Sequence, residues 1–203
     1  MPKKYAGRRG RPRKTKSVKR PRGLKQPVQY FTRSKYIPGA FAAAAGATNY
    51  DAAVARLVDV PSYTDFTNLY DQYKIISVKF AYLPRGNQAD LGTSGSQITR
   101  LFSVLDYDDS VVPTSIDQLC EYQNLKMTNT SKAHVRSFQP RYIREIDTGL
   151  GATGKEVVRG GWIDCTNNNV THRGIKLALQ GPVVGTITYD LMITYKLAFK
   201  NVR

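Results

Sequence analysis

The sequence predicts an all-β fold: a two-sheet antiparallel sandwich that follows a disordered, basic N-terminal segment. Three observations support this prediction. Lys and Arg are concentrated near the N-terminus, short β-prone runs fill the rest of the chain, and polar or glycine-rich segments separate those runs. A chain of 203 residues is long enough for one domain and a tail.

The formal net charge of +16 is distributed very unevenly. Residues 1–50 contain 14 of the 31 Lys and Arg and no acidic residue, because Asp51 is the first carboxylate. The remaining residues therefore hold 17 basic against 15 acidic side chains, a balance of only +2. The basic character of the protein belongs to its N-terminal part.

Residues 1–27 form the basic arm, which we expect to be disordered in the free chain. Apolar side chains are nearly absent from it, and Gly and Pro interrupt it, so burial cannot offset the entropy lost on ordering. Phosphate neutralisation requires charge density rather than a fixed geometry. The predicted nucleic-acid-binding residues of the arm are Lys3, Lys4, Arg8, Arg9, Arg11, Arg13, Lys14, Lys16, Lys19, Arg20, Arg22 and Lys25.

The composition of the arm also allows two other interpretations. The arm could be only a solvated tail, or it could be a nuclear-import signal, and an import signal is compatible with the packaging of nucleic acid. Residues 9–14 (RGRPRK) resemble an AT-hook core, although a tail rich in Arg, Gly and Pro produces such strings easily. The import candidates are Lys14, Lys16, Lys19, Arg20 and Arg22.

Three aromatic residues, Tyr30, Phe31 and Tyr36, follow the arm and could stack on bases. The alternative is ordinary burial in the first strand. The periodicity of residues 73–83 places Ile76, Val78, Phe80 and Tyr82 on one buried face, with Ser77, Lys79 and Ala81 on the other. The eight predicted strands cover residues 28–37, 73–83, 98–107, 124–130, 134–143, 160–165, 174–180 and 186–200.

Helical signals are confined to two segments. Residues 40–57 are rich in Ala but contain Gly46, which leaves a helix, two helical turns or an extended segment open. Residues 115–122 predict a short helix with Ser115 as its N-cap. Long loops are predicted at residues 86–97 and 149–155.

Signals for other classes of protein are weak. Cys120 and Cys165 are too few for a disulfide framework, and we expect reduced thiols without a zinc motif. The sequence shows no run of about 20 apolar residues for a membrane span and no secretory signal, which favours an intracellular, soluble protein.

No enzyme motif and no cofactor is predicted. His134 and His172 lie beside no evident nucleophile, and the spacing of Cys165 and His172 is uninformative. Asp106, Asp108 and Asp109 are a weak candidate for a Ca²⁺ site, although such a cluster is more often a solvated turn.

Five segments together resemble the capsid (coat) proteins of small circular single-stranded DNA viruses, the circovirus-like group that encodes a replication initiator. They occur in the order expected for that group, at residues 65–87, 134–141, 160–167, 172–179 and 188–201. The resemblance implies an eight-stranded jelly roll over residues 28–203, assembly into a sixty-subunit icosahedral shell, and an arm that faces inward onto single-stranded DNA. It also implies location in the virion, and in the host nucleus during assembly.

The leading hypothesis is therefore a capsid subunit that assembles with itself, packages nucleic acid with its arm and meets a host import receptor. The alternative is a cellular nucleic-acid-binding β-domain of chromatin or ribosome type with a basic tail. Eight strands with long loops favour the capsid subunit, as does the nearly neutral folded part, which suits dense packing of many copies. DNA as the cargo follows from the resemblance alone.

Overall fold

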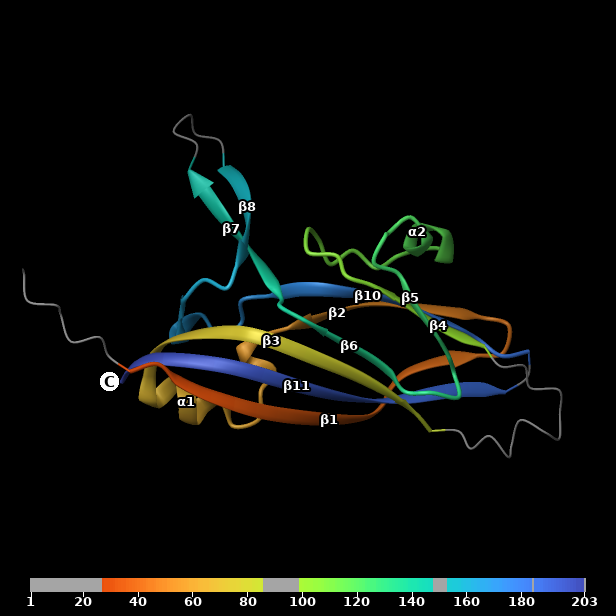
Figure 1. The fold of residues 1–203 in the computed structure, drawn as a ribbon, viewed down its shortest axis with the longest axis horizontal. Helices are drawn as coiled ribbons and strands as arrows, with labels where there is room; N and C mark the ends of the chain where they lie inside the picture. The colour runs from red at the N-terminus through yellow and green to blue at the C-terminus, as the bar shows by residue number, and fades with distance from the viewer. Residues whose placement is uncertain (1–26, 86–98, 148–152, 184, 203) are drawn as a thin grey trace, which may run out of the picture.

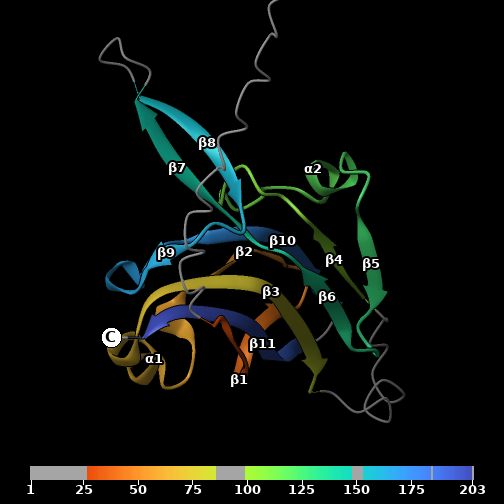
Figure 2. The same ribbon diagram turned by 60° about the vertical axis from the view of Figure 1, so that its left-hand side comes forward.

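The computed structural model describes every residue except 1–26, 86–98, 148–152, 184 and 203. In the described residues, two antiparallel sheets pack face to face as a sandwich (Figures 1 and 2). This arrangement buries one set of alternating side chains from each sheet between the two layers.

The first sheet, called sheet A here, has the strand order β1-β11-β3-β6, and the short strand β9 pairs with β3. The bounds are β1 Gln29–Ala44, β3 Tyr70–Pro84, β6 His134–Phe138, β9 Ile163–Asp164 and β11 Thr186–Val202.

The second sheet, called sheet B here, has the order β5-β4-β10-β7-β8, and β2 pairs with β10. The bounds are β2 Thr48–Ala55, β4 Arg100–Val104, β5 Lys126–Asn129, β7 Arg141–Asp147, β8 Thr153–Arg159 and β10 His172–Gln180.

The strand order is that of a jelly roll, as the resemblance implied. Four strands, β1, β11, β3 and β6, face β2, β10, β4 and β5 across the core. The hairpin β7–β8 is an addition that projects away from both layers (Figures 1 and 2). All-β class, antiparallel pairing and the jelly-roll sandwich are thus confirmed.

The strands that make up the jelly roll differ in part from those predicted. Each predicted run contains a strand, but residues 134–143 hold two, β6 and β7, because Pro140 lacks the N–H that would continue the ladder. The run 160–165 contributes only the peripheral β9. The predicted loop 149–155 partly belongs to β8.

The Ala-rich segment 40–57, left open between helix and extended chain, is mainly extended. It completes β1 and forms β2, which pairs with β10 from Thr48 opposite Gln180 to Ala55 opposite His172. Cross-strand pairing overrides the weak β-propensity of Ala. Gly39, at a φ of 61°, lies where the β1–β11 register shifts.

Two short helices complete the described fold. Helix α1, Tyr63–Leu69, was not predicted and lies at the sandwich edge near the end of β11 (Figure 1). Helix α2, Ile116–Cys120, was predicted, and its N-cap Ser115 accepts a hydrogen bond from the Gln118 N–H at 3.3 Å. Short 3₁₀ turns cover Leu57–Asp59 and Cys165–Asn167.

Strand β3 corrects one residue of the predicted buried face. Val78, Phe80 and Tyr82 are buried, at 0–1% exposure, as predicted, but Ile76 is only half-buried. The β11 partners shift between Lys196, opposite Ser77, and Leu197, opposite Ile75, so Ile76 is the extra residue of a β-bulge. The bulge moves the buried alternation to Tyr73 and Ile75 on its other side.

Candidate nucleic-acid interface

The twelve predicted nucleic-acid-binding residues of the arm, Lys3 through Lys25, lie outside the described residues, as do the five import candidates. The described chain shows where the arm attaches. Strand β1 begins at Gln29, directly after it, and is the edge strand of sheet A. The arm is therefore joined covalently to an edge of sheet A.

The alternation of β1 separates the three aromatic residues near the arm. Tyr30 and Tyr36 are 71% and 57% exposed on the face turned away from sheet B. Phe31 points the other way, and its ring centroid lies 5.0 Å from that of Phe66 and 5.8 Å from that of Phe199. The sequence left open whether these residues stack on bases or are buried. In the structure, Phe31 packs in the fold, whereas the rings of both tyrosines remain available for stacking.

Three lysines join the tyrosines on this face. Lys196 of β11 is paired with Thr32 on one side and Ser77 on the other. Lys79 of β3 is paired with Thr194 and Ser137, and Lys74 is paired with Ala198. Because neighbouring strands lie about 4.8 Å apart, these side chains form one continuous patch.

We call this patch the lysine face. Its members are Tyr30, Thr32, Ser34, Tyr36, Lys74, Ser77, Lys79, Ala81, Val135, Ser137, Met192, Thr194, Lys196 and Ala198. None of these residues is acidic, and none of the three lysines forms an ion pair within the part of the chain that the structure describes. The face therefore presents uncompensated positive charge.

A carboxylate marks one end of the lysine face. Asp190 accepts hydrogen bonds from the Tyr36 hydroxyl at 2.5 Å and from the Gly39 N–H at 2.7 Å, and it pairs with Arg85. The bond from Tyr36 is the main reason that the pKa of Asp190 is lowered, and the same bond raises the pKa of Tyr36. Asp190 is thus neutralised locally, and the ring of Tyr36 is held in place while it stays exposed.

The acidic cluster that the sequence analysis considered as a Ca²⁺ site instead holds the ammonium group of Lys176, which contacts Asp106 and Asp109. Lys176 Nζ lies 2.7 Å from Asp106 Oδ2 and 2.7 Å from Asp109 Oδ1. Asp108 is exposed, and its N–H donates to Asp106 Oδ1 at 3.0 Å. In the described residues, no group of three His, Cys, Asp or Glu is placed to hold a metal ion.

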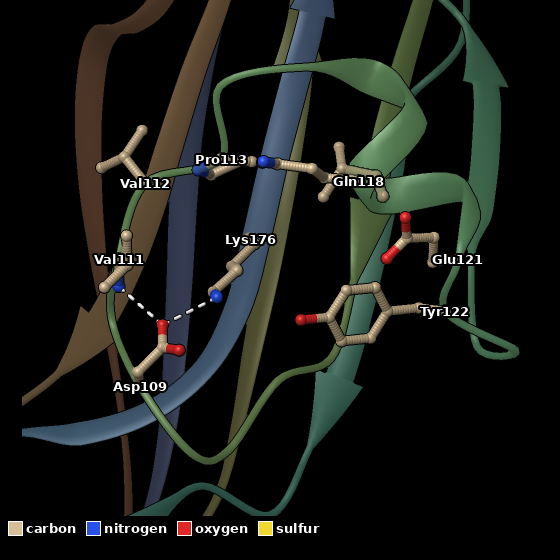
Figure 3. Close-up of a pocket in the computed structure, with 9 residues that line it drawn as sticks. Asp109, Val111, Val112, Pro113, Gln118, Glu121, Tyr122 and Lys176 are labelled. Atoms are coloured by element: carbon tan, nitrogen blue, oxygen red, sulfur yellow. Dashed lines mark hydrogen bonds and ion pairs between the residues drawn. The ribbon is translucent and has the colours of Figure 1, made fainter.

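The ion pairs keep this buried site charged. Burial is the largest single influence and favours the neutral forms of Asp106 and Lys176. The hydrogen bonds and opposite charges around each group together outweigh it, so the pKa of Asp106 is lowered and that of Lys176 is raised. Tyr122 donates a 2.7 Å hydrogen bond to Asp106. A pocket of about 340 Å³ lies beside this network, between Val111, Val112 and α2 (Figure 3).

Both histidines are buried in the fold. His134 is hydrogen-bonded to Ser103 at 2.7 Å and to Thr128 at 2.8 Å, and burial together with Lys126 and Arg136 lowers its pKa to about 4. His172 donates from Nδ1 to the Val170 carbonyl at 3.0 Å, and burial lowers its pKa to about 4. Cys120 and Cys165 form no disulfide, and Cys165 is buried.

The sequence pattern could place some of the lysine face but not assemble it. The alternation of β3 put Lys79 on the face opposite Val78, as the structure shows. The approach of Lys196 and Tyr30 depends on β11 lying between β1 and β3, which no local pattern indicates. Pairing between strands more than 100 residues apart created the patch.

Comparisons with known structures agree with the fold. The crystal structure of the 60-mer BFDV capsid protein matches with a TM-score of 0.67 and 18% identity over 87% of this chain and 95% of that one. The decameric BFDV capsid protein matches at 0.60 and 18%, over 86% and 100% of the two chains. Cocksfoot mottle virus matches at 0.54 and 13%, over 86% and 97%.

Three further findings concern the sequence of the chain and its helices. No curated protein sequence matches the chain, and no helix in the described residues is long and apolar enough to cross a membrane. The family of circovirus capsid proteins, however, matches residues 2–203. Because that match extends over nearly the whole chain, the protein belongs to the circovirus capsid protein family and is a viral capsid subunit.

Proposed function

We propose that this subunit assembles into a closed icosahedral shell and packages single-stranded DNA through its basic arm. The BFDV capsid protein, which shares the fold, was crystallised as a 60-mer, and that supports a shell of sixty copies. The observation that carries the packaging proposal is the separation of charge. The arm holds twelve basic residues and no acid, whereas residues 51–203 are nearly neutral.

The physical basis is counterion release. Each Lys or Arg that contacts a phosphate releases condensed cations, and this favours binding at low salt with little sequence preference. Sixty arms of twelve charges would carry roughly 720 positive charges, enough to neutralise about as many nucleotides. The nearly neutral remainder lets copies pack side by side without strong repulsion.

The test replaces all twelve basic residues of the arm with Gln in the full-length chain. Particles should still form, but their nucleic-acid content, measured by absorbance at 260 and 280 nm, should fall several-fold. A matched variant with the six arm Arg changed to Lys keeps the charge and should retain most of the cargo. Particles of the Gln variant with full cargo would contradict the proposal.

The division into arm and shell domain belongs to the same proposal. Limited trypsinolysis of the free subunit should remove residues 1–25 first and leave a stable fragment that starts near Gln26 and contains the shell domain of residues 28–203. For nuclear import, a reporter fused to residues 1–27 should enter the nucleus. Changing Lys14, Lys16, Lys19, Arg20 and Arg22 to Gln should abolish entry.

The AT-hook alternative predicts that the arm prefers an A·T-rich duplex to other nucleic acids, and that Arg11→Ala removes this preference.

A further inference from the structure

The exposed tyrosines and the lysines that form no ion pair among the described residues occupy the same face of sheet A. The carboxylates on this side of the sheet, Asp190 and Asp164, lie at its two ends, opposite Leu83 and Gln72. We propose that the lysine face is a second binding surface for single-stranded nucleic acid, with Tyr30 and Tyr36 stacking on bases and Lys74, Lys79 and Lys196 contacting phosphates. This inference rests on the proposed packaging function and assigns it a folded contact surface.

The chemistry of the face fits a single strand. Base–aromatic stacking tolerates any sequence because every base has a π-face, and single-strand binding proteins combine such rings with a positively charged surface. Tyr30 and Tyr36 are six residues apart on one strand, which places them about 20 Å from each other. The lysines lie on the neighbouring strands between these two rings.

The shape of the face disfavours duplex DNA. A major groove admits a helix or a two-stranded ribbon, whereas the lysine face spans four paired strands. In a duplex the base faces are also stacked on one another and cannot meet a tyrosine ring. Four-stranded sheets with exposed aromatic side chains are a known way of binding unpaired bases.

The position of the arm supports the same occupant. The arm ends at Pro27, three residues before Tyr30, so single-stranded nucleic acid bound by the arm would start close to this face. Lys74 is also oriented by its surroundings. A Cβ at Gly160, which has a φ of 66°, would lie 2.9 Å from Lys74 Cε, so the lysine stem packs directly against this glycine.

The experiment uses the full-length chain with the twelve basic residues of the arm changed to Gln, so that the binding measured comes from the folded surface and not from the arm. Binding of a fluorescent 20-nucleotide oligo(dT) is followed by anisotropy at several salt concentrations. Tyr30→Ser should weaken binding by about tenfold, whereas Tyr30→Phe keeps the ring and should stay within about twofold. A duplex of equal length should bind more weakly and show no loss on Tyr30→Ser.

The lysines have a matched control. The double variant Lys79→Gln and Lys196→Gln should lower the log–log salt slope by about 1.4, since a single strand releases about 0.7 counterion per contact. The double variant Lys132→Gln and Lys155→Gln removes the same charge from exposed positions outside the face and should leave the slope unchanged.

The outcomes separate the two proposals. Unchanged affinity in Tyr30→Ser and an unchanged slope in the Lys79 and Lys196 variant would overturn the lysine face alone. A full nucleic-acid content in particles whose twelve basic arm residues are changed to Gln would instead overturn the proposal that the arm packages nucleic acid. If the Lys79 and Lys196 variant stops particle formation while oligo(dT) binding is unaffected, the face is a contact between subunits, and the inference is wrong.

Discussion

The central strands of the two sheets differ in how many faces they bury. Strand β11 alternates between buried and accessible residues, so sheet A buries one face and leaves the lysine face open. Strand β10 is buried almost without interruption, because sheet B has a second layer over its other face. There, Phe102, Val104 and Ala178 pack against Leu119 of α2. Antiparallel sheets accept both arrangements.

The same comparison separates the lysines of the two sheets. Lys176 of β10 is buried under that second layer and is neutralised by two carboxylates. Lys196 of β11 is exposed and has no ion pair among the described residues. Covered lysines of this protein serve the fold, whereas open ones are available to a polyanion.

The largest effect of a single substitution is expected inside sheet A. Val78→Asp places a charge in the core without a partner and should destabilise the protein by about 4 kcal/mol or more, which blocks folding. Ile76→Asp, at the half-buried bulge, should cost only about 1 kcal/mol. Soluble yield and urea denaturation measure both. Equal losses would show that the bulge does not turn Ile76 away from the core.

Lys176→Met should destabilise the fold by about 3 kcal/mol in urea denaturation, because Asp106 stays buried without its cation. Adding Asp106→Asn should restore a large part of that loss. Lys196→Met, on the open face of sheet A, should change stability by no more than about 0.5 kcal/mol. A similar cost for Lys176→Met and Lys196→Met would remove the distinction between the two sheets.

Acid should destabilise the sandwich through its two histidines. His134 joins β6 of sheet A to β4 and β5 of sheet B, and His172 pairs β10 with β2. Both have a pKa of about 4 in the fold, below the usual 6.5, so the unfolded chain binds more protons between these values. Stability should therefore fall as the pH drops from 6.5 to 4, by about 1.4 kcal/mol per pH unit for each histidine.

The control for this pH dependence is His172→Gln, which should remove about half of the slope between pH 4.5 and 6, as measured by urea denaturation at each pH. Asp106 and Asp109 have a lowered pKa, so their contribution is lost only at more acidic pH, below the ordinary carboxyl value of 3.8. A slope that is unaffected by the substitution would contradict the buried neutral histidine.

The smallest effect concerns the layer over sheet B. Ser115→Ala removes the side-chain oxygen that caps α2 and should cost about 1 kcal/mol. Ser115→Asn or Ser115→Asp should retain most of the stability, since both side chains cap helices well. Thermal unfolding measures the difference, and an unchanged transition temperature for Ser115→Ala would show that the cap does not hold α2 in place.

Local sequence determined the class of this protein and much of its framework. Each of the eight β-prone runs contains a strand, although β2 and β8 lie outside them, and Ser115 marks the start of α2. Both signals depend on residues only a few positions apart. The concentration of basic residues before Asp51, visible in the sequence alone, motivates the packaging proposal.

Only the tertiary structure decided which strands meet and what covers them. The bulge at Ile76, the β2 pairing of an Ala-rich segment, and the ion pairs of Lys176 with Asp106 and Asp109 all depend on partners distant in sequence. The exposure of Tyr30 and the partial burial of Phe31 depend on Phe66 of α1 and Phe199 of β11, whose rings pack on one face of β1 and not the other. Such pairings follow from the packing of the whole chain, because the free energy of burial depends on every element that covers a side chain.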